Sequence, residues 1–160
     1  MKKLLSFTLV ILTVCWMTVI FSFSCENGSE SAESSGGFIR YLLNTFSPEF
    51  SELSEAAQKA AIESYDHFIR KAAHFTIYAT LGALIFSSVK SIGADCKNSY
   101  ILALVIGTAY AVSDEIHQYF VPGRACMIRD MLLDSCGVAF GAAAILLLVK
   151  LISKLRNKNK

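Results

Sequence analysis

The stretch Ala109–Asp134, AYAVSDEIHQYFVPGRACMIRDMLLD, decides how the rest of the chain is organised. One apolar run enters it from Ile101 and another leaves it from Met131. The polar residues between the two runs are Asp114, Glu115, His117, Gln118, Arg124, Arg129, Asp130 and Asp134. A charged group at membrane depth costs from about 3 to above 10 kcal/mol, so such groups are usually kept for a task. The stretch therefore indicates where chemistry or recognition takes place, but it does not specify the molecule that is handled.

The composition is that of a small integral membrane protein. Of the 160 residues, 54% are hydrophobic and 18% are charged, which is too apolar for an ordinary soluble domain. One compact bundle is the natural size, so we predict a single domain over residues 1–160. The sequence has no long basic run with interleaved aromatic residues, so no nucleic-acid partner is expected.

Four apolar runs have the length of membrane-spanning helices. They cover residues 4–23, 72–89, 100–120 and 131–152, and about 20 apolar residues cross a hydrocarbon core of about 30 Å. The first run follows Lys2 and Lys3, and a basic start before an apolar core is also typical of a cleaved signal peptide. Ser22–Cys25 resembles a lipoprotein cleavage site only weakly, and the run is long for a signal peptide, so a retained helix is favoured.

Residues 24–70 form an outer segment between the first two runs. Ser24–Gly37 is rich in Ser, Gly and Glu and is predicted to be an exposed, flexible link, and residues 38–46 are predicted to rest on the membrane surface. From Pro48 to Phe68 apolar residues recur at helical spacing opposite an acidic face. This pattern predicts an amphipathic helix that either caps the bundle or offers residues 51–66 to a protein partner. The predicted fold class is an all-α integral membrane protein with four transmembrane helices and this outer helix.

The 15 Lys and Arg residues are divided unevenly between the two ends of the predicted bundle. Most lie at the end that holds both termini: Lys2, Lys3, Lys90, Lys97, Lys150, Lys154, Arg156, Lys158 and Lys160. Cytoplasmic ends of membrane proteins carry an excess of Lys and Arg. The excess predicts a multi-pass protein with both termini in the cytoplasm, and it places the outer segment and residues 114–130 outside.

The five cysteines do not suggest a metal or redox site. Their spacing matches neither a zinc pattern nor a CxxC motif. Cys25 and Cys126 would lie at the same outer end, where a disulfide could form, but two free thiols are favoured. A mixed set of His74, Asp114, His117 and Asp130 has the right donor types for a metal but no tight ligand spacing, so neither metal nor cofactor is expected.

Polar residues recur on shared faces of three predicted helices. Residues three or four apart meet on one helix face, which pairs Lys71 with His74, Asp114 with His117 and Gln118, and Asp130 with Asp134. Glu115 projects about 100° away from Asp114. Arg124 follows a Val-Pro-Gly turn and could bridge carboxylates or bind an anion. The residues predicted to line an outward-facing pocket are Lys71, His74, Asp114, Glu115, His117, Gln118, Arg124, Asp130 and Asp134.

A purely structural role is the alternative for these residues. Ion pairs such as Asp114–Arg124 or Lys71–Asp130 could simply hold the helices in register. For Lys71, Arg129 and Glu115 taken singly, that interpretation is at least as good as a functional one. For several such groups at one depth a function is favoured, and the candidates for acid–base catalysis are Asp114, His117 and Asp130.

Two motifs carry a resemblance to a known family. RKAAHFTIYATLG (Arg70–Gly82) and SDEIHQYFVPGR (Ser113–Arg124), followed by Asp130, are similar to the VanZ-like family of small bacterial membrane proteins. The chain departs from the family pattern at Asp134, where the family has Asn, and at Ile77, where it often has an acid. The resemblance implies a bacterial cytoplasmic membrane and a link to teicoplanin, a glycopeptide that acts on cell-wall precursors outside it. It implies no established reaction.

Three hypotheses about function follow. The leading one is a pocket that binds or modifies a cell-envelope lipid or lipid-linked precursor and thereby influences glycopeptide susceptibility. In that hypothesis Arg124 and Lys71 bind the anion, while the neighbouring acids and His117 orient it or transfer protons. The second is a membrane-embedded hydrolase or transferase that acts on a lipid or polyprenyl phosphate. The third is a non-catalytic scaffold that docks a protein through residues 51–66.

Overall fold

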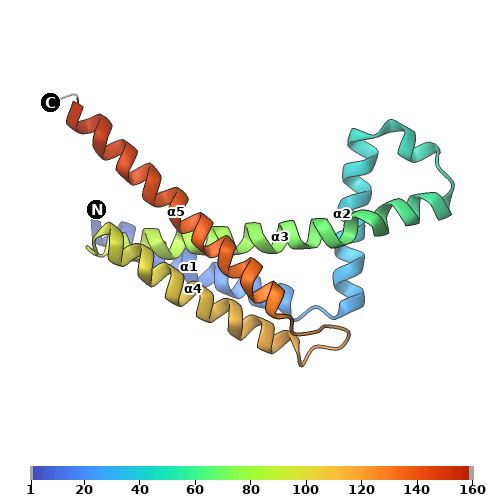
Figure 1. Ribbon diagram of the computed structural model, residues 1–160, viewed down its shortest axis with the longest axis horizontal. Coiled ribbons are helices and arrows are strands. Elements are labelled where there is room, and N and C mark those ends of the chain that lie inside the picture. The colour runs from blue at the N-terminus through green and yellow to red at the C-terminus, as the bar shows by residue number, and fades with distance from the viewer. Residues whose placement is uncertain (1, 159–160) are drawn as a thin grey trace.

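The computed structural model describes residues 2–158 and is helical throughout its ordered elements (Figure 1). Lys160, which we counted with the terminal Lys/Arg residues, lies outside the described residues, as do Met1 and Asn159. The elements in chain order are α1 (Lys2–Ser24), α2 (Gly28–Phe46), the short 3-10 helix η1 (Pro48–Glu52), α3 (Glu55–Ser91), α4 (Cys96–Gln118) and α5 (Ile128–Lys158). Within residues 2–158, α1, α3, α4 and α5 are long and apolar enough to cross a membrane. The all-α, multi-pass fold class is therefore confirmed.

α3 lies at the centre of the bundle and contacts α1, α2, α4 and α5. The core forms around Tyr78, Leu81 and Phe86 of this helix, which pack against the small residues Ala103 and Ala111 of α4 and their neighbours on α5. Large apolar side chains on α1, α4 and α5 face outward instead. Such an apolar exterior is what lipid tails solvate, because they are as apolar as the side chains themselves.

Glycines bring α3 and α5 into close contact. A Cβ atom on Gly141 would overlap the carbonyl oxygen of Ala79, and one on Gly82 would overlap the carbonyl oxygen of Val138. Small residues at such crossings let helix backbones approach closely in lipid, where the hydrophobic effect does not drive helices together. Small residues of α5 therefore pack directly against the backbone of α3.

The prediction of a flexible link at Ser24–Gly37 is wrong, because α2 begins at Gly28. The Asn27 side chain accepts hydrogen bonds from the backbone N–H groups of Ser29 and Glu30, and the Glu30 carboxylate accepts one from the Asn27 N–H. This reciprocal cap satisfies the first backbone donors of the helix. Ile39 then buries its side chain on the inner face of α2. The cap and this packing outweigh a composition that is typical of loops.

The separate amphipathic helix predicted from Pro48 to Phe68 is also corrected. The segment divides into η1 and the first turns of α3, which begins at Glu55 behind a cap from Ser54. Ser47, which precedes η1, makes no side-chain cap bond. Neither proline nor glycine interrupts residues 55–81, so the helix continues into the membrane-spanning part without a break. We call α2, η1 and residues 55–70 of α3 the arm.

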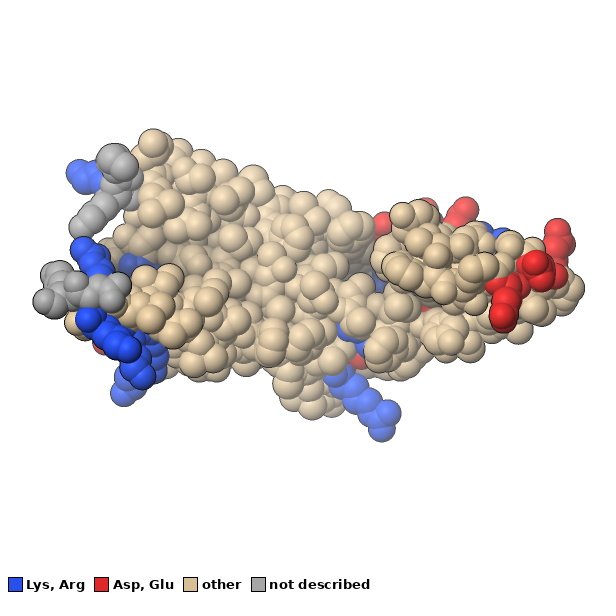
Figure 2. Space-filling model, turned by 90° about the horizontal axis from the view of Figure 1, so that it is seen from above, with Lys and Arg blue, Asp and Glu red and all other residues tan. Residues whose placement is uncertain are grey.

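The two ends of the molecule differ in charge and shape. Both termini lie at one end, and the arm and the turn between α4 and α5 lie at the other (Figure 1). Figure 2 shows Lys and Arg side chains gathered at the terminal end and Asp and Glu side chains at the far tip of the arm. The turn within Ala109–Asp134, with the polar residues around it, therefore lies at the end away from the termini.

Candidate functional site

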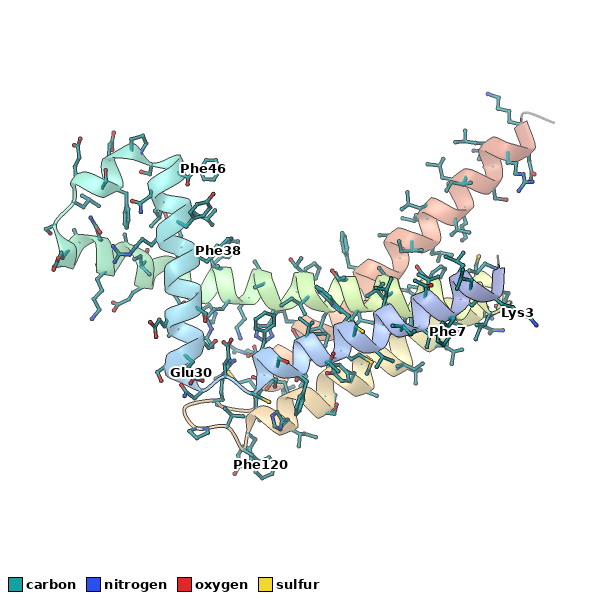
Figure 3. The ribbon with its side chains drawn as sticks, turned by 180° about the vertical axis from the view of Figure 1, so that it is seen from behind. Lys3, Phe7, Glu30, Phe38, Phe46 and Phe120 are labelled. Atoms are coloured by element: carbon teal, nitrogen blue, oxygen red, sulfur yellow. The ribbon has the colours of Figure 1, made fainter. Side chains whose placement is uncertain are left out.

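A cavity of about 630 Å³ opens between α1, α2, α3 and α4 at the end of the bundle away from the termini. Much of its wall is apolar and includes Ile20, Phe23, Phe38, Ile69 and Ile77. Phe38 projects from α2 on the side that faces the spanning helices (Figure 3). The volume lies within the range of about 300–1,000 Å³ that is usual for ligand pockets.

The polar end of this cavity adjoins a second one of about 270 Å³. The second cavity lies between α3 and the turn that leads into α5, and its lining includes Asp66, Lys71 and Asp130. The residues that line both cavities are Arg70, His74, Gln118 and Arg124. An apolar space and a polar space therefore meet at a shared set of cations, imidazole and amide.

Two carboxylates are buried beside the cavities. Asp114 is 4% exposed, and its Oδ2 accepts a hydrogen bond from Gln118 Nε2 at 3.2 Å. Asp134 is fully buried, and its Oδ1 lies 3.6 Å from His74 Nδ1. Among the described residues, Asp114 Oδ1, both Asp134 oxygens and the Tyr78 hydroxyl have no hydrogen-bond partner. Buried polar atoms are normally paired, so this concentration of exceptions marks the region as a candidate site.

Glu115 has a different role from its neighbour. It is fully buried, lines neither cavity, and accepts a hydrogen bond from the Met127 backbone N–H at 3.0 Å through Oε2. This bond fixes the turn just before α5 begins at Ile128. Glu115 therefore acts as a positioning residue rather than as a lining residue.

Lys71 and Asp130 form an ion pair that joins α3 to α5. Their side chains are 29% and 18% exposed, and both line the second cavity. The pair therefore has the geometry expected of an ion pair that holds the two helices in register. The pair leaves the Lys71 charge already compensated, which makes it a weaker anion binder than the sequence suggested.

The turn between α4 and α5 holds Arg124 against the end of α1. Gly123 adopts the positive φ of 75° that this turn needs, and the Pro122 carbonyl accepts a hydrogen bond from the Gly28 N–H at 3.1 Å. Arg124 Nε donates to the Glu26 carbonyl at 3.1 Å and its Nη2 donates to the Phe23 carbonyl at 3.3 Å. These bonds place the guanidinium at the C-terminal end of a helix, where the helix dipole favours a cation.

The Arg124 charge lies in an unusual electrostatic setting. Burial lowers the pKa of the guanidinium, and the nearby positive charge of Arg70 lowers this pKa further, against the opposing charge of Glu26. An arginine nevertheless stays protonated in proteins, because its ordinary pKa is above 12. Its two bonds to α1 carbonyls use only part of its five N–H donors.

His117 does not join the other predicted site residues. Its ring lies 4.8 Å from the Phe21 ring, and its Nε2 is 3.5 Å from the Cys25 Sγ atom. Like Glu115 and Asp134, it lines neither of the two cavities. A spacing of three residues leaves two side chains about 60° apart around a helix, and here that angle turns His117 toward α1 while Asp114 faces the cavity. All five cysteines, Cys25 included, are free.

Two residues that the sequence analysis did not place in the site lie there. Arg70 lines both cavities and is 3.7 Å from Asp66 on the next turn of α3. Tyr78 lines the first cavity one helical turn beyond His74. Both residues lie on one stripe of α3, which consists of residues 66, 70, 74 and 78 at intervals of four. This spacing is the sequence signal that could have identified Arg70 and Tyr78 as site residues.

No group of three or more His, Cys, Asp or Glu side chains within residues 2–158 has an arrangement that could hold a metal ion. The site as the structure has it combines guanidinium, ammonium, imidazole and carboxyl groups. Chemically, such a set can bind an anion, orient a polar headgroup or transfer a proton.

Comparison with known proteins gives one match. A family model described as VanZ/LLP1 matches residues 9–150, which covers most of the chain. The match includes all of α3 and α4, most of α1 and α5, and the residues that line both cavities. Neither a curated protein nor a solved structure matches the chain significantly.

Proposed function

The chain belongs to the VanZ/LLP1 family, and from that premise we propose that it binds a cell-envelope lipid or lipid-linked precursor through its polar pocket. The observation that carries the proposal is the continuity of the two cavities. An apolar cavity of about 630 Å³ leads to a polar end that carries His74, Asp114 and Arg124. A molecule with a hydrocarbon chain and a charged headgroup matches both parts, whereas a wholly polar solute would leave the apolar part unused.

The proposed orientation follows from the charges at the two ends. The Lys/Arg-rich terminal end faces the cytoplasm, so the pocket and the arm face outward from the bacterial cytoplasmic membrane. Lipid-linked cell-wall precursors are exposed on that side. Binding one of them would change how a glycopeptide such as teicoplanin reaches its target, and this is the route by which we propose that the protein influences susceptibility.

Filling the apolar cavity tests lipid binding directly. Ala73 lines the cavity, so Ala73→Trp would occupy space that the chain needs. Ala109 is likewise an exposed alanine of a spanning helix, but it lines neither cavity, so Ala109→Trp is the matched control. We expect lipid retained by purified protein in mild detergent, measured by mass spectrometry, to fall at least several-fold for Ala73→Trp alone. Equal retention by the wild type and both variants would contradict the proposal.

The polar end is tested in cells at matched membrane abundance. Asp114→Asn and Arg124→Gln alter residues that line the cavity, whereas His117→Ala alters a residue that faces α1. We expect the first two substitutions to reduce any effect of the protein on teicoplanin susceptibility more than His117→Ala does. The reverse order would place the site around His117 and overturn the assignment of the pocket.

A second candidate is a membrane hydrolase or transferase that acts on a lipid or polyprenyl phosphate. The observation that favours it is the buried Asp114 and Asp134 carboxylates, which have oxygens without a hydrogen-bond partner among residues 2–158 and lie beside His74. Such groups can donate or accept a proton during cleavage of an ester. Turnover of radiolabelled lipid by purified protein, lost in Asp114→Asn, would establish the enzyme. Binding without turnover would leave the first proposal alone.

A further inference from the structure

Arg70 lies where three cavities meet. It lines the apolar cavity, the polar cavity and a third, shallow one that is bounded by Asn27, Gly28, Ser29, Pro122 and Gly123. Arg124 lines the first two of these as well. The boundary between the apolar and the polar space is therefore marked by two guanidinium groups, one from α3 and one from the turn before α5.

The positive charge at this boundary is only partly balanced by the protein, although Asp66 pairs with Arg70 and the charge of Glu26 acts on Arg124. Arg70 has Asp66 at 3.7 Å, which is too long for a hydrogen bond, and both side chains are partly exposed. No carboxylate oxygen of the described residues lies within 4.0 Å of the Arg124 guanidinium, which instead donates to two backbone carbonyls. Lys71, the third cation nearby, is paired with Asp130. Two neighbouring like charges, one of them half-buried, are stabilised by an anion placed between them.

The shape of the site limits which anion fits. The planar guanidinium matches phosphate oxygens with two parallel hydrogen bonds, and two such groups can hold one phosphate from two sides. The apolar cavity lies on one side of the pair and the polar cavity, which contains Asp66, His67 and Asp130, lies on the other. A phosphodiester is an anion of this kind, because it links a hydrocarbon chain to a polar substituent.

We propose that Arg70 and Arg124 bind the phosphodiester group of a lipid between them, with its chain in the apolar cavity and its polar substituent in the second cavity. This inference rests on the proposed function and adds to it the chemical class of the ligand and a binding residue, Arg70. The carboxylates of the second cavity favour a substituent that donates hydrogen bonds, such as one with hydroxyl groups.

The test is a native mass-spectrometry titration of the full-length protein in mild detergent with three probes. Phosphatidylglycerol carries the phosphodiester and two chains, diacylglycerol carries the same chains without phosphate, and inorganic phosphate carries the anion alone. We expect phosphatidylglycerol to bind at least about tenfold more tightly than diacylglycerol, since charge-assisted hydrogen bonds contribute about 1.5–3 kcal/mol each. We also expect inorganic phosphate at millimolar concentration not to displace it.

Variants assign the binding to the two arginines. Arg70→Gln and Arg124→Gln should each weaken phosphatidylglycerol binding about tenfold or more, while diacylglycerol binding stays unchanged. Arg129 is an exposed arginine at the same end of the molecule that lines none of the three cavities, so Arg129→Gln should bind as the wild type does. Arg124 also holds the turn, so Arg70→Gln, which breaks no bond to the α1 carbonyls, is the decisive variant.

The outcomes separate this inference from the proposed function. Equal binding of diacylglycerol and phosphatidylglycerol, or no effect of Arg70→Gln, would overturn the phosphodiester assignment and leave lipid binding in the cavity intact. Arginine-dependent binding of inorganic phosphate without lipid would show a soluble anion as the ligand and overturn both. Failure of every lipid to bind would likewise overturn both proposals.

Discussion

Glu115 and Asp114 are neighbours in sequence but have separate surroundings. Asp114 faces the apolar cavity and is bonded to Gln118, whereas Glu115 lies beneath the turn and is bonded to the backbone of Met127. The rotation of about 100° between adjacent helical residues produces this division. Asp114 is therefore available to a ligand, whereas Glu115 holds the turn in place.

We predict that Glu115→Ala destabilises the protein by about 1–3 kcal/mol, because it removes the acceptor of the Met127 N–H and truncates a fully buried side chain. Glu115→Gln keeps an acceptor oxygen and should cost less. Thermal unfolding in detergent, followed by circular dichroism, would show the lower midpoint. Glu49 is exposed on η1, so Glu49→Ala is the control and should leave the midpoint unchanged. An equal loss for Glu115→Ala and Glu49→Ala would contradict the assigned role.

Single residues were the hardest part of the site to predict from sequence. Helical spacing correctly put Asp114 and Gln118 together. The Lys71–Asp130 ion pair was considered only as a purely structural alternative. The spacing could not resolve the angle of about 60° that turns His117 toward Phe21. Helical spacing did not place Arg70 in the site either, because the cavities it lines are formed together with the turn and the start of α2.

At the scale of elements, the close crossing of α3 and α5 depends on glycines, which have no side chain at the points of contact. The Ala79 carbonyl occupies the position that a Cβ atom on Gly141 would need. Backbone atoms cannot rotate away as the end of a side chain can, so an added methyl group must push the two helices apart. Because α3 carries Arg70 and α5 begins beside Met127, such a displacement would also disturb the site.

We predict that Gly141→Ala lowers stability by about 1–3 kcal/mol through overpacking. Gly37 lies in α2 with nothing within 4 Å of its hypothetical Cβ atom, so Gly37→Ala is the matched control. It should be neutral or stabilising by up to about 1 kcal/mol, because alanine favours a helix over glycine. Chemical denaturation in mixed detergent would measure both. A stable Gly141→Ala variant would mean that the helices do not cross this closely.

The membrane-spanning helices could be predicted from the sequence, whereas the structure of the arm could not. An apolar run of about 20 residues has few alternatives to a spanning helix, since backbone groups must bond internally in hydrocarbon. Each predicted span accordingly falls within a long helix, apart from small differences at the ends. Residues 24–70 lie where water competes for every backbone bond, so a single cap at Asn27 and the continuity of α3 decided their structure.

At the scale of the whole molecule, charge separates the two ends. Lys154, Arg156 and Lys158 lie in the last turns of α5, and Glu52, Glu55 and Glu63 belong to the arm. Figure 2 shows basic side chains gathered at the terminal end and acidic side chains on the arm. The excess of Lys and Arg at one end is the signal that orients membrane proteins during insertion. Sequence was sufficient to predict this polarity, because it depends on charge positions and not on side-chain contacts.

We predict that a membrane-impermeant maleimide labels the arm but not the termini in intact cells. In a variant without native cysteines, Glu52→Cys should react from outside, because the arm projects from the end opposite the termini. Lys158→Cys should react only after the membrane is permeabilised. Labelling of Lys158→Cys in intact cells, with Glu52→Cys protected, would establish the inverted topology.

The unbroken length of α3 has a consequence for what reaches the pocket first. Its 37 residues extend to about 55 Å at 1.5 Å per residue, while the hydrocarbon layer is about 30 Å thick. A helix without a break keeps its first turn at a set height above the headgroups, which a loop could not do. In the proposed orientation, a water-soluble molecule outside the membrane therefore meets the carboxylates near Glu55 before it reaches the cavities. The negative charge there would attract a cation.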